Sequence, residues 1–258
     1  MVDIAIFTAL AWERRAVTRA LAGIVSGDGP RVWRARLGDG ASCLVVQTGI
    51  GPERARLAAS GVPPARLFLA CGCGGALVTW LRPGDLVAAD GVVSLEAHAR
   101  PTAVAATGGP LAAWAAAQGF RLHRGPIVSS AVVLGTAAEK AAAGRSGALL
   151  VDMESAAVAT VAQARGIPFV GLRVVLDAAA ETLPDTFSAI DETTGEVRVR
   201  RAVAGLAVRP WRWVGAARLA RQQRVAARRL GAFLSRLLDG GGLTALLGSP
   251  LEVRAAAR

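Results

Sequence analysis

The sequence predicts an α/β protein of three layers, in which a mixed, mostly parallel central sheet carries helices on both faces. Along the first 177 residues, short apolar runs typical of buried strands alternate with stretches of helical periodicity. A length of 258 residues and a hydrophobic content of 53% suffice for one large domain with a substantial core. From residue 201 onward the chain is rich in Ala, Leu and Arg, which predicts a basic helical extension.

In the first half of the chain, buried apolar runs predict the strands, and spacing and capping signals predict the helices. Residues 2–9 are the first apolar run, and a helix with a mixed face is expected at 12–22. Pro52 begins the helix expected at 52–60, where its missing N–H costs little because the first turn leaves that donor unpaired. The segment ARLFLACGCGGAL predicts a strand that runs into a glycine-rich turn. Further strands are expected at 31–37, at 41–47 and within RPGDLVAADGVVS.

The second half continues the alternation. Helices are expected at 110–118 and 136–144, and strands at 126–134, 148–152 and 167–177. The segment VDMES opens another helix, which is expected to end near residue 165. Ligands of such sheets bind where the carboxyl ends of the strands meet loops, and four candidate motifs lie at such ends: TGIG, CGCGG, VDMES and Asp177.

The composition argues against a metal site and against a membrane span. Three cysteines and two histidines give no metal-binding spacing, and free cysteines suit a reducing compartment. The N-terminal segment lacks the basic start of a signal peptide, and the longest uncharged run is interrupted by Pro and Gly. We therefore expect a cytoplasmic protein with neither a metal nor an organic cofactor.

The charge divides the chain into two regions. Residues 1–197 hold 17 basic and 17 acidic side chains, whereas residues 198–258 hold 13 arginines and only two acids, Asp239 and Glu252. The whole net charge of +11 therefore belongs to the last 61 residues. We expect a catalytic region at 1–197 and an arginine-rich helical extension at 198–258, packed on the same domain or continuing it.

The extension fits three kinds of contact. Arg218, Arg221, Arg224 and Arg228 recur at helical spacing, and Trp211 and Trp213 alternate with arginines just before them. A solvated face or a subunit surface would explain the stripe, and so would nucleic acid, although no base-reading motif accompanies it. We favour an anionic membrane surface on the inner face of the membrane, because Trp suits the headgroup region and each nearby Arg contributes about 1 kcal/mol.

The motifs of residues 2–177 stand in the order typical of the nucleoside phosphorylase and nucleosidase superfamily. They are TALAWE, TGIG, CGCGGAL, RPGDLV, VDMESAAVA and IPFVGLRVVLD. A narrower resemblance is to the hopanoid-associated phosphorylases, and WERRAV, HRGPIVSSAVVLGTAAEKAAA and the tail VRRAVAGLAVRPWRWVGAARLARQ carry it. The resemblance implies the nucleoside phosphorylase fold, a purine nucleoside substrate and a homo-oligomer.

The resemblance also implies roles in cleaving an N-glycosidic bond through an oxocarbenium-like sugar cation. Glu154 would bind the ribose hydroxyls, Met153 would pack on the sugar, and Asp177 would protonate or hydrogen-bond the purine. Glu13 stands where the nucleosidases activate water. Carboxylates suit such roles because burial and neighbouring charges tune their pKa values. Without the resemblance, each acid also fits an ordinary role as a solvated or capping residue.

Four further residues are expected beside the substrate: Cys73, Gly74, Ser130 and Val133. Glycine lets the backbone approach a sugar or phosphate closely, although a tight connection alone would also explain it. Here the sequence departs from the nucleosidases, which usually carry Ser at the position of Cys73 and an aromatic residue near Val133. The missing aromatic ring argues against methylthioadenosine as the substrate.

These observations predict removal of adenine from a nucleoside, with membrane-resident adenosylhopane as the leading substrate. A soluble nucleosidase for adenosylhomocysteine, methylthioadenosine or futalosine is the enzymatic alternative. A non-catalytic nucleoside-binding membrane protein and a nucleic-acid-binding protein are the alternatives of another class. Water and phosphate both remain open as the nucleophile, because Glu13 favours water whereas the narrower resemblance favours phosphate as a co-substrate.

Overall fold

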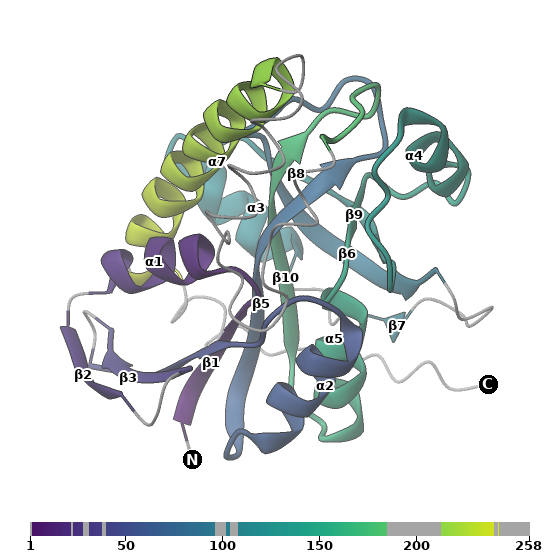
Figure 1. Cartoon of the computed structure of the whole chain (residues 1–258). Coiled ribbons are helices and arrows are strands. Elements are labelled where there is room, and N and C mark those ends of the chain that lie inside the picture. Colours follow the sequence, from purple (N-terminus) through teal and green to yellow (C-terminus); the bar gives the residue numbers. More distant parts are fainter. Residues whose placement is uncertain are drawn as a thin grey trace.

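The structure is a computed structural model, and ten strands of its described part form one sheet with helices on both faces (Figure 1). This arrangement confirms the three-layer α/β architecture. The described residues are 2–21, 23–27, 31–37, 40–95, 102–103, 108–184, 213–239 and 242.

The elements follow one another as the sequence pattern predicts for most of the chain. The strands are β1 (Val2–Thr8), β2 (Gly23–Gly27), β3 (Val32–Arg36), β4 (Ser42–Gln47), β5 (Ala65–Ala76), β6 (Leu86–Ser94), β7 (Thr102–Ala103), β8 (Leu122–Ser129), β9 (Leu150–Asp152) and β10 (Phe169–Asp177). The helices are α1 (Ala11–Ala20), α2 (Pro52–Gly61), α3 (Gly108–Ala117), α4 (Ala137–Gly144), α5 (Ser155–Ala164) and α7 (Trp213–Asp239).

Strand β5 is the centre of the sheet. It pairs in parallel with β1 and β10 and in antiparallel fashion with β9. On one side the sheet continues from β1 through β4 and β3 to β2. On the other side β10, β6, β8 and β9 lead back to β5, so that these five strands close on themselves. The closure brings the carboxyl ends of β9 and β10 close to the glycine-rich end of β5.

Two hydrophobic clusters fill the space between the sheet and its helices. Ile4, Ile6 and their neighbours on alternate strand positions pack under α1, α3 and α7. Ala5 and Phe7, which point the opposite way from β1, pack under α2 and α5. Alternating side chains of a strand face opposite sides of a sheet, so these continuous apolar strands are buried on both faces.

Two predicted strands differ from the structure, and two observed strands were not predicted. Strand β5 continues through the glycine run instead of turning there, because the sheet needs residues without a side chain at that place. A Cβ atom on Gly74 would lie 2.2 Å from Leu150 Cδ2. Strand β8 lies at Leu122–Ser129, a few residues before the predicted strand at 126–134. The sequence analysis contained no strand at β2 or β7, which are short edge strands defined by their partners.

Helix α7 packs its apolar stripe onto the first cluster, beside α1 and β10. The stripe is fully or almost fully buried and consists of Leu230, Phe233, Leu234, Leu237 and Leu238. The four arginines of the basic stripe are exposed on the outer side of the helix. No helix in the described ranges is both long and apolar enough to span a bilayer. The region boundary at 197, Trp211 and the side chain of Trp213 lie outside the described part, so their proposed roles stay predictions.

Candidate active site

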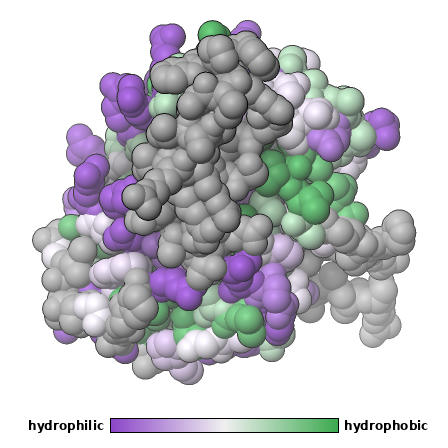
Figure 2. Space-filling model, in the orientation of Figure 1, coloured by the Kyte–Doolittle hydropathy of each residue, from purple (hydrophilic) through white to green (hydrophobic). Residues whose placement is uncertain are grey.

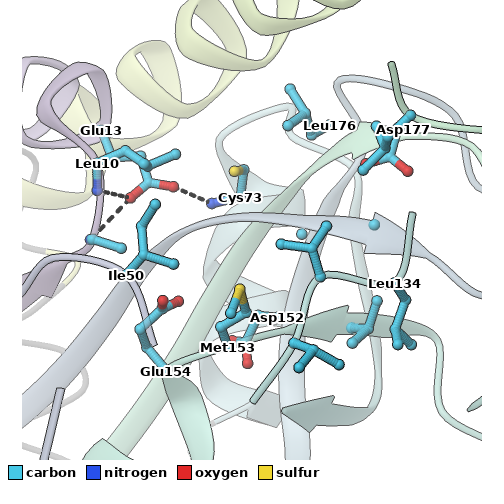
Figure 3. Close-up of a pocket in the computed structure, with 17 residues that line it drawn as sticks. Leu10, Glu13, Ile50, Cys73, Leu134, Asp152, Met153, Glu154, Leu176 and Asp177 are labelled. Carbon is cyan, nitrogen blue, oxygen red and sulfur yellow. Dashed lines mark hydrogen bonds between the residues drawn. The ribbon is translucent and has the colours of Figure 1, made fainter. Parts of the chain in front are cut away.

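A cavity opens where β1, β5, β9 and β10 end, and it encloses about 630 Å³ when its open mouth is counted. Figure 3 shows Glu13 and Glu154 on one side of this cavity and Asp177 on the other. Its remaining wall is mostly aliphatic and includes Leu10, Ile50, Val132, Val133, Leu134, Leu176 and Leu183.

Glu13 lies on the first turn of α1 and is 2% exposed. Its Oε2 accepts hydrogen bonds from the backbone N–H groups of Ala9 (3.0 Å) and Leu10 (2.9 Å), and its Oε1 accepts one from Cys73 (2.8 Å). Burial raises the pKa of Glu13, and these hydrogen bonds counteract the increase. The Cys73 thiol forms a further hydrogen bond with this carboxylate, which borders the cavity.

The glycines of β5 allow this carboxylate to lie against the strand. A Cβ atom on Gly72 would lie 2.8 Å from Glu13 Oε1, closer than any side chain permits. Burial and then the negative charge of Glu13 raise the pKa of the neighbouring Cys73 well above its ordinary value. The thiol therefore stays protonated at neutral pH and does not act as a nucleophile.

Glu154 precedes α5 and lines the cavity together with Met153. Its Oε1 accepts a hydrogen bond from the backbone N–H of Gly51 (2.8 Å), at the end of the TGIG loop. Gly51 has a φ of +100°, a conformation that residues with a side chain rarely adopt, so a glycine is needed to aim this N–H. Burial and then the charge of Asp152 raise the pKa of Glu154 to about 8.

Asp152, which also lines the cavity, forms a buried ion pair with Arg173. Arg173 Nε donates to Asp152 Oδ2 (2.6 Å), and its Nη2 donates to the hydroxyl of Ser155 (2.8 Å). Asp152 Oδ1 accepts from the hydroxyl of Ser129 and from the backbone N–H of Ser155. Burial lowers the pKa of Arg173, but the charges of Asp152, Glu154 and Glu13 raise it by more. The net effect is an increase, so the guanidinium stays charged. Asp152 therefore has the structural role that its place before α5 predicts.

Asp177 ends β10 and is 3% exposed. Burial raises its pKa, and the ammonium of Lys140, which donates to Asp177 Oδ2, counteracts the increase. Within the described residues, Oδ1 accepts no hydrogen bond from the protein. The structure thus provides a carboxyl group at the cavity wall with one oxygen left for a ligand.

Of the sequence-predicted residues, seven line this cavity and one does not. The seven are Glu13, Cys73, Gly74, Val133, Met153, Glu154 and Asp177. Ser130 is buried within the wall, where its hydroxyl accepts from the backbone N–H of Val132 (3.2 Å) and its own N–H donates to Asp152 O. The roles assigned to these residues stay predictions.

Three residues of the site were not predicted from the sequence. Gly51 anchors Glu154 from 103 positions away, and only its place in TGIG indicated a role. Arg173 is the single charged residue within the apolar strand before Asp177, which is the signal that could have indicated it. Lys140 is the only lysine of the chain. In the part of the chain that the structure describes, no group of His, Cys, Asp and Glu is arranged to hold a metal ion.

A family model described as the phosphorylase superfamily matches residues 3–209 of the chain. The chain belongs to the phosphorylase superfamily. The match covers most of the sequence, including the cavity and its acids, and it confirms the family and the enzyme class of nucleosidases and nucleoside phosphorylases that the motifs implied. No curated protein sequence matches the chain.

Solved structures with the same fold include several nucleosidases. The 5′-methylthioadenosine/S-adenosylhomocysteine nucleosidase of Neisseria meningitidis, in complex with methylthio-immucillin-A, has a TM-score of 0.72 and 16% identity; the match covers 93% of this chain and 100% of that one. The futalosine hydrolase of Helicobacter pylori has a TM-score of 0.66 and 18% identity, with 92% and 98% covered. The S-adenosylhomocysteine nucleosidase of Streptococcus pyogenes has a TM-score of 0.67 and 18% identity, with 92% and 97% covered. At these identities the likeness establishes the fold.

Proposed function

We propose that this phosphorylase superfamily protein cleaves the N-glycosidic bond of an adenine nucleoside, and that its substrate carries a large apolar 5′ group, adenosylhopane being the leading candidate. The observation that carries the proposal is the arrangement of three acids, two buried and one partly buried, around one aliphatic cavity. Glu13 and Glu154 lie on one side and Asp177 on the other (Figure 3). This arrangement suits a nucleoside, because its polar sugar would lie between the attacking nucleophile and the purine.

The charges of the site suit a cationic transition state. Three buried carboxyl groups, those of Glu13, Asp152 and Asp177, and the partly buried Glu154 stand against two buried cations, Arg173 and Lys140. Fixed charges aimed at the place where charge develops are often the largest contribution to catalysis. An ionised carboxylate next to the ribose, which Glu154 provides once the ribose hydroxyls are bound, stabilises an oxocarbenium-like sugar more than it stabilises the neutral nucleoside.

Each acid then has one task in the reaction. Glu154 accepts hydrogen bonds from the ribose hydroxyls and fixes the sugar. Asp177, whose pKa is raised by burial, presents Oδ1 to the purine and supplies the proton or hydrogen bond that lets the base leave. Glu13, which borders the cavity, orients a water molecule toward the anomeric carbon. Phosphate would take the place of this water if the reaction is a phosphorolysis.

The cavity wall supports an apolar substituent. None of the described residues that line it is aromatic, so the stacking surface of a typical adenine pocket is missing. Val132 and Val133, at its mouth, are 63% and 40% exposed. On the face shown in Figure 2, apolar surface gathers toward the right of the view, and a second apolar area lies near the bottom. Such surface is favourable for a lipid-like group because burial contributes about 25 cal/mol per Å².

We include in the proposal that the exposed arginines of α7 hold the enzyme on the inner face of an anionic membrane. The apolar stripe of α7 is already buried in the core, which leaves its outer side for such a contact. A membrane-resident nucleoside would then reach the cavity without leaving the bilayer. Assembly into homo-oligomers stays a prediction that light scattering would test.

A product assay tests the proposed function. Adenosylhopane in mixed micelles, methylthioadenosine, adenosylhomocysteine and futalosine would be incubated with the enzyme, with and without phosphate, and free base and sugar products quantified. We expect base release to be fastest with the apolar substrate. A free sugar product would identify water as the nucleophile, and a phosphorylated one would identify phosphate.

The matched control is Asp177→Asn, which keeps the volume of the side chain. We expect its turnover to fall by roughly 10²–10⁴, the usual contribution of a general acid. If the folded wild-type enzyme releases no base from any of these nucleosides, the proposal is overturned. If it cleaves adenosylhomocysteine faster than adenosylhopane, the proposed substrate becomes a soluble nucleoside.

A further inference from the structure

Lys140 is the only lysine among 30 basic residues, and it lies fully buried in α4. An ammonium group strongly prefers water, so burying it is costly unless each of its donors finds an acceptor. The other cations of the chain are arginines, most of which lie at the surface. The position of Lys140 therefore needs an explanation in terms of what it contacts.

The three N–H donors of Lys140 find three acceptors on one stretch of chain. Nζ donates to Asp177 Oδ2, to the carbonyl oxygen of Ala178 (3.0 Å) and to that of Glu181 (2.7 Å). A compact ammonium with three donors fits this cage, whereas a planar guanidinium presents its donors in a flat fork. These acceptor atoms belong to the last residue of β10 and to the segment that follows it along the cavity.

The contact fixes how Asp177 faces the cavity. Because Oδ2 is bonded to Lys140, the carboxyl group can turn only Oδ1 toward a ligand. A second link, from the backbone N–H of Leu183 to the carbonyl oxygen of Gly135 (2.7 Å), ties the same segment to the start of α4. Leu183 itself lines the cavity. Helix α4 is thus the support of the cavity side that carries Asp177.

The charge of Lys140 also acts on the acidity of Asp177. Burial raises the pKa of Asp177, and Lys140 is the strongest influence in the opposite direction. Glu181 raises it further and Arg218 lowers it, so the groups that face Asp177 from the following segment and from α7 partly offset each other. Without Lys140, the carboxyl group would hold its proton more tightly.

We infer that Lys140 is a positioning residue for the leaving-group acid. It holds Asp177 with Oδ1 toward the purine and keeps its carboxyl group acidic enough to release a proton as the glycosidic bond breaks. This inference rests on the proposed function. It assigns to α4 a role in catalysis although Lys140 does not line the cavity.

The first test compares the pH dependence of variants. Lys140→Met removes the charge and keeps most of the side-chain volume, whereas Lys140→Arg keeps the charge. Arg145→Met is the control, because it removes an exposed charge just after α4. In Lys140→Met we expect kcat to fall roughly 10²-fold, as for other misplaced catalytic groups, with KM changed much less. The alkaline limb of kcat should move to higher pH, because the active, protonated form of Asp177 persists longer.

Lys140→Arg should keep the alkaline limb near its wild-type position, and Arg145→Met should keep both rate and pH profile. An unchanged pH profile in folded Lys140→Met would overturn the inference. It would also be overturned if Lys140→Arg and Lys140→Met lost kcat equally and neither shifted the alkaline limb of the kcat profile.

A second measurement needs no activity and no Lys140 variant. Because the chain has one lysine, labelling with lysine that carries nitrogen-15 at Nζ gives a single side-chain signal in NMR spectra. We expect a slowly exchanging ammonium signal in the wild-type protein, and a shifted, faster-exchanging one in Asp177→Asn. The same signal in both proteins would overturn the contact. If the wild-type enzyme cleaves no nucleoside, the proposed function fails, and this comparison still shows whether Lys140 holds Asp177.

Discussion

Glu154 combines a pKa raised to about 8 with a fixed backbone partner, Gly51. A carboxyl group with a pKa of about 8 carries its proton through most of the neutral range in the free protein. Binding of ribose hydroxyls, which donate hydrogen bonds, favours the ionised form. Protonation of this one residue therefore couples substrate binding to pH.

We predict that Glu154→Gln weakens a ribonucleoside much more than its 2′-deoxy analogue. A hydrogen bond to a charged group contributes about 1.5–3 kcal/mol, which corresponds to roughly ten- to a hundredfold in affinity. The difference should be largest above about pH 8, where the wild-type carboxylate is ionised. Calorimetric titration with a non-hydrolysable pair of analogues would measure it. Equal losses for both sugars at high pH would mean that Glu154 does not contact the 2′-hydroxyl.

The buried acids also predict how stability depends on pH. Burial raises the pKa values of Glu13, Glu154 and Asp177 above those in the unfolded chain, so the folded state binds protons that the unfolded state has released. The free energy of unfolding should therefore fall as pH rises from about 5 to about 8, by at most about 1.4 kcal/mol per pH unit for each proton. Urea denaturation across this range would measure the slope.

Glu154→Gln should make this slope shallower, because glutamine does not titrate. A wild-type stability that increases steadily between pH 5 and 8 would contradict the raised pKa values.

At the scale of elements, the end of β5 decides whether the cavity can form. Gly72 and Gly74 occupy strand positions where Glu13 and the neighbouring β9 approach the backbone. The glycine run is therefore part of the sheet, and its lack of side chains leaves the space in which an acid and a strand lie against β5.

We predict that Gly74→Ala destabilises the protein by about 1–3 kcal/mol, the usual cost of an added methyl group in a packed core. Its Cβ atom would lie 2.2 Å from Leu150 Cδ2 and 2.5 Å from the backbone oxygen of Val151, so the backbone next to Met153 has to move. Gly91→Ala in β6 is the matched control, because a Cβ atom there would meet nothing within 4 Å. Thermal unfolding and base release would both be measured. Similar effects of the two substitutions would refute this account of β5.

At the scale of the whole molecule, the charge is concentrated in one region. The first 197 residues are neutral in total and contain the site, whereas the last 61 carry +11. Helix α7 joins the two, since its apolar stripe completes the core and its exposed arginines form the outer surface. A charge placed in this way can control where the enzyme works without altering the cavity.

We predict that the protein sediments with anionic vesicles and not with neutral ones, and that salt weakens this binding because exposed charges are screened over roughly 10 Å at 0.1 M. Replacing Arg221, Arg224 and Arg228 by Gln should release it. Arg218 stays unchanged in this variant, because it donates to the carbonyl oxygen of Thr182 near the cavity.

The control replaces Arg56, Arg66 and Arg145, which are exposed but lie outside α7, and it should still bind vesicles. Cleavage of a water-soluble nucleoside should stay the same in both variants. If the wild-type protein does not bind vesicles at low salt, the exposed side of α7 is better explained as a contact between subunits. If the protein binds DNA more tightly than anionic vesicles, a nucleic-acid partner is favoured.

The sequence by itself determined the layers, most of the elements and the acids of the site. Apolar strands buried on both faces and helices with one apolar stripe carry their own periodicity, so β1, β4, β10 and the buried stripe of α7 could be predicted. Glu13, Glu154 and Asp177 follow strand or loop motifs whose order is typical of the family, and the structure brings them around one cavity.

Only the tertiary structure decided what holds these acids in place. Lys140, Arg173 and Gly51 contact residues 18 to 103 positions away through the closure of the sheet, and no local pattern encodes such pairings. Edge strands β2 and β7 likewise exist because a partner offers free N–H and C=O groups. Local periodicity reflects which side chains avoid water, whereas partners across the chain depend on how the buried surfaces come together.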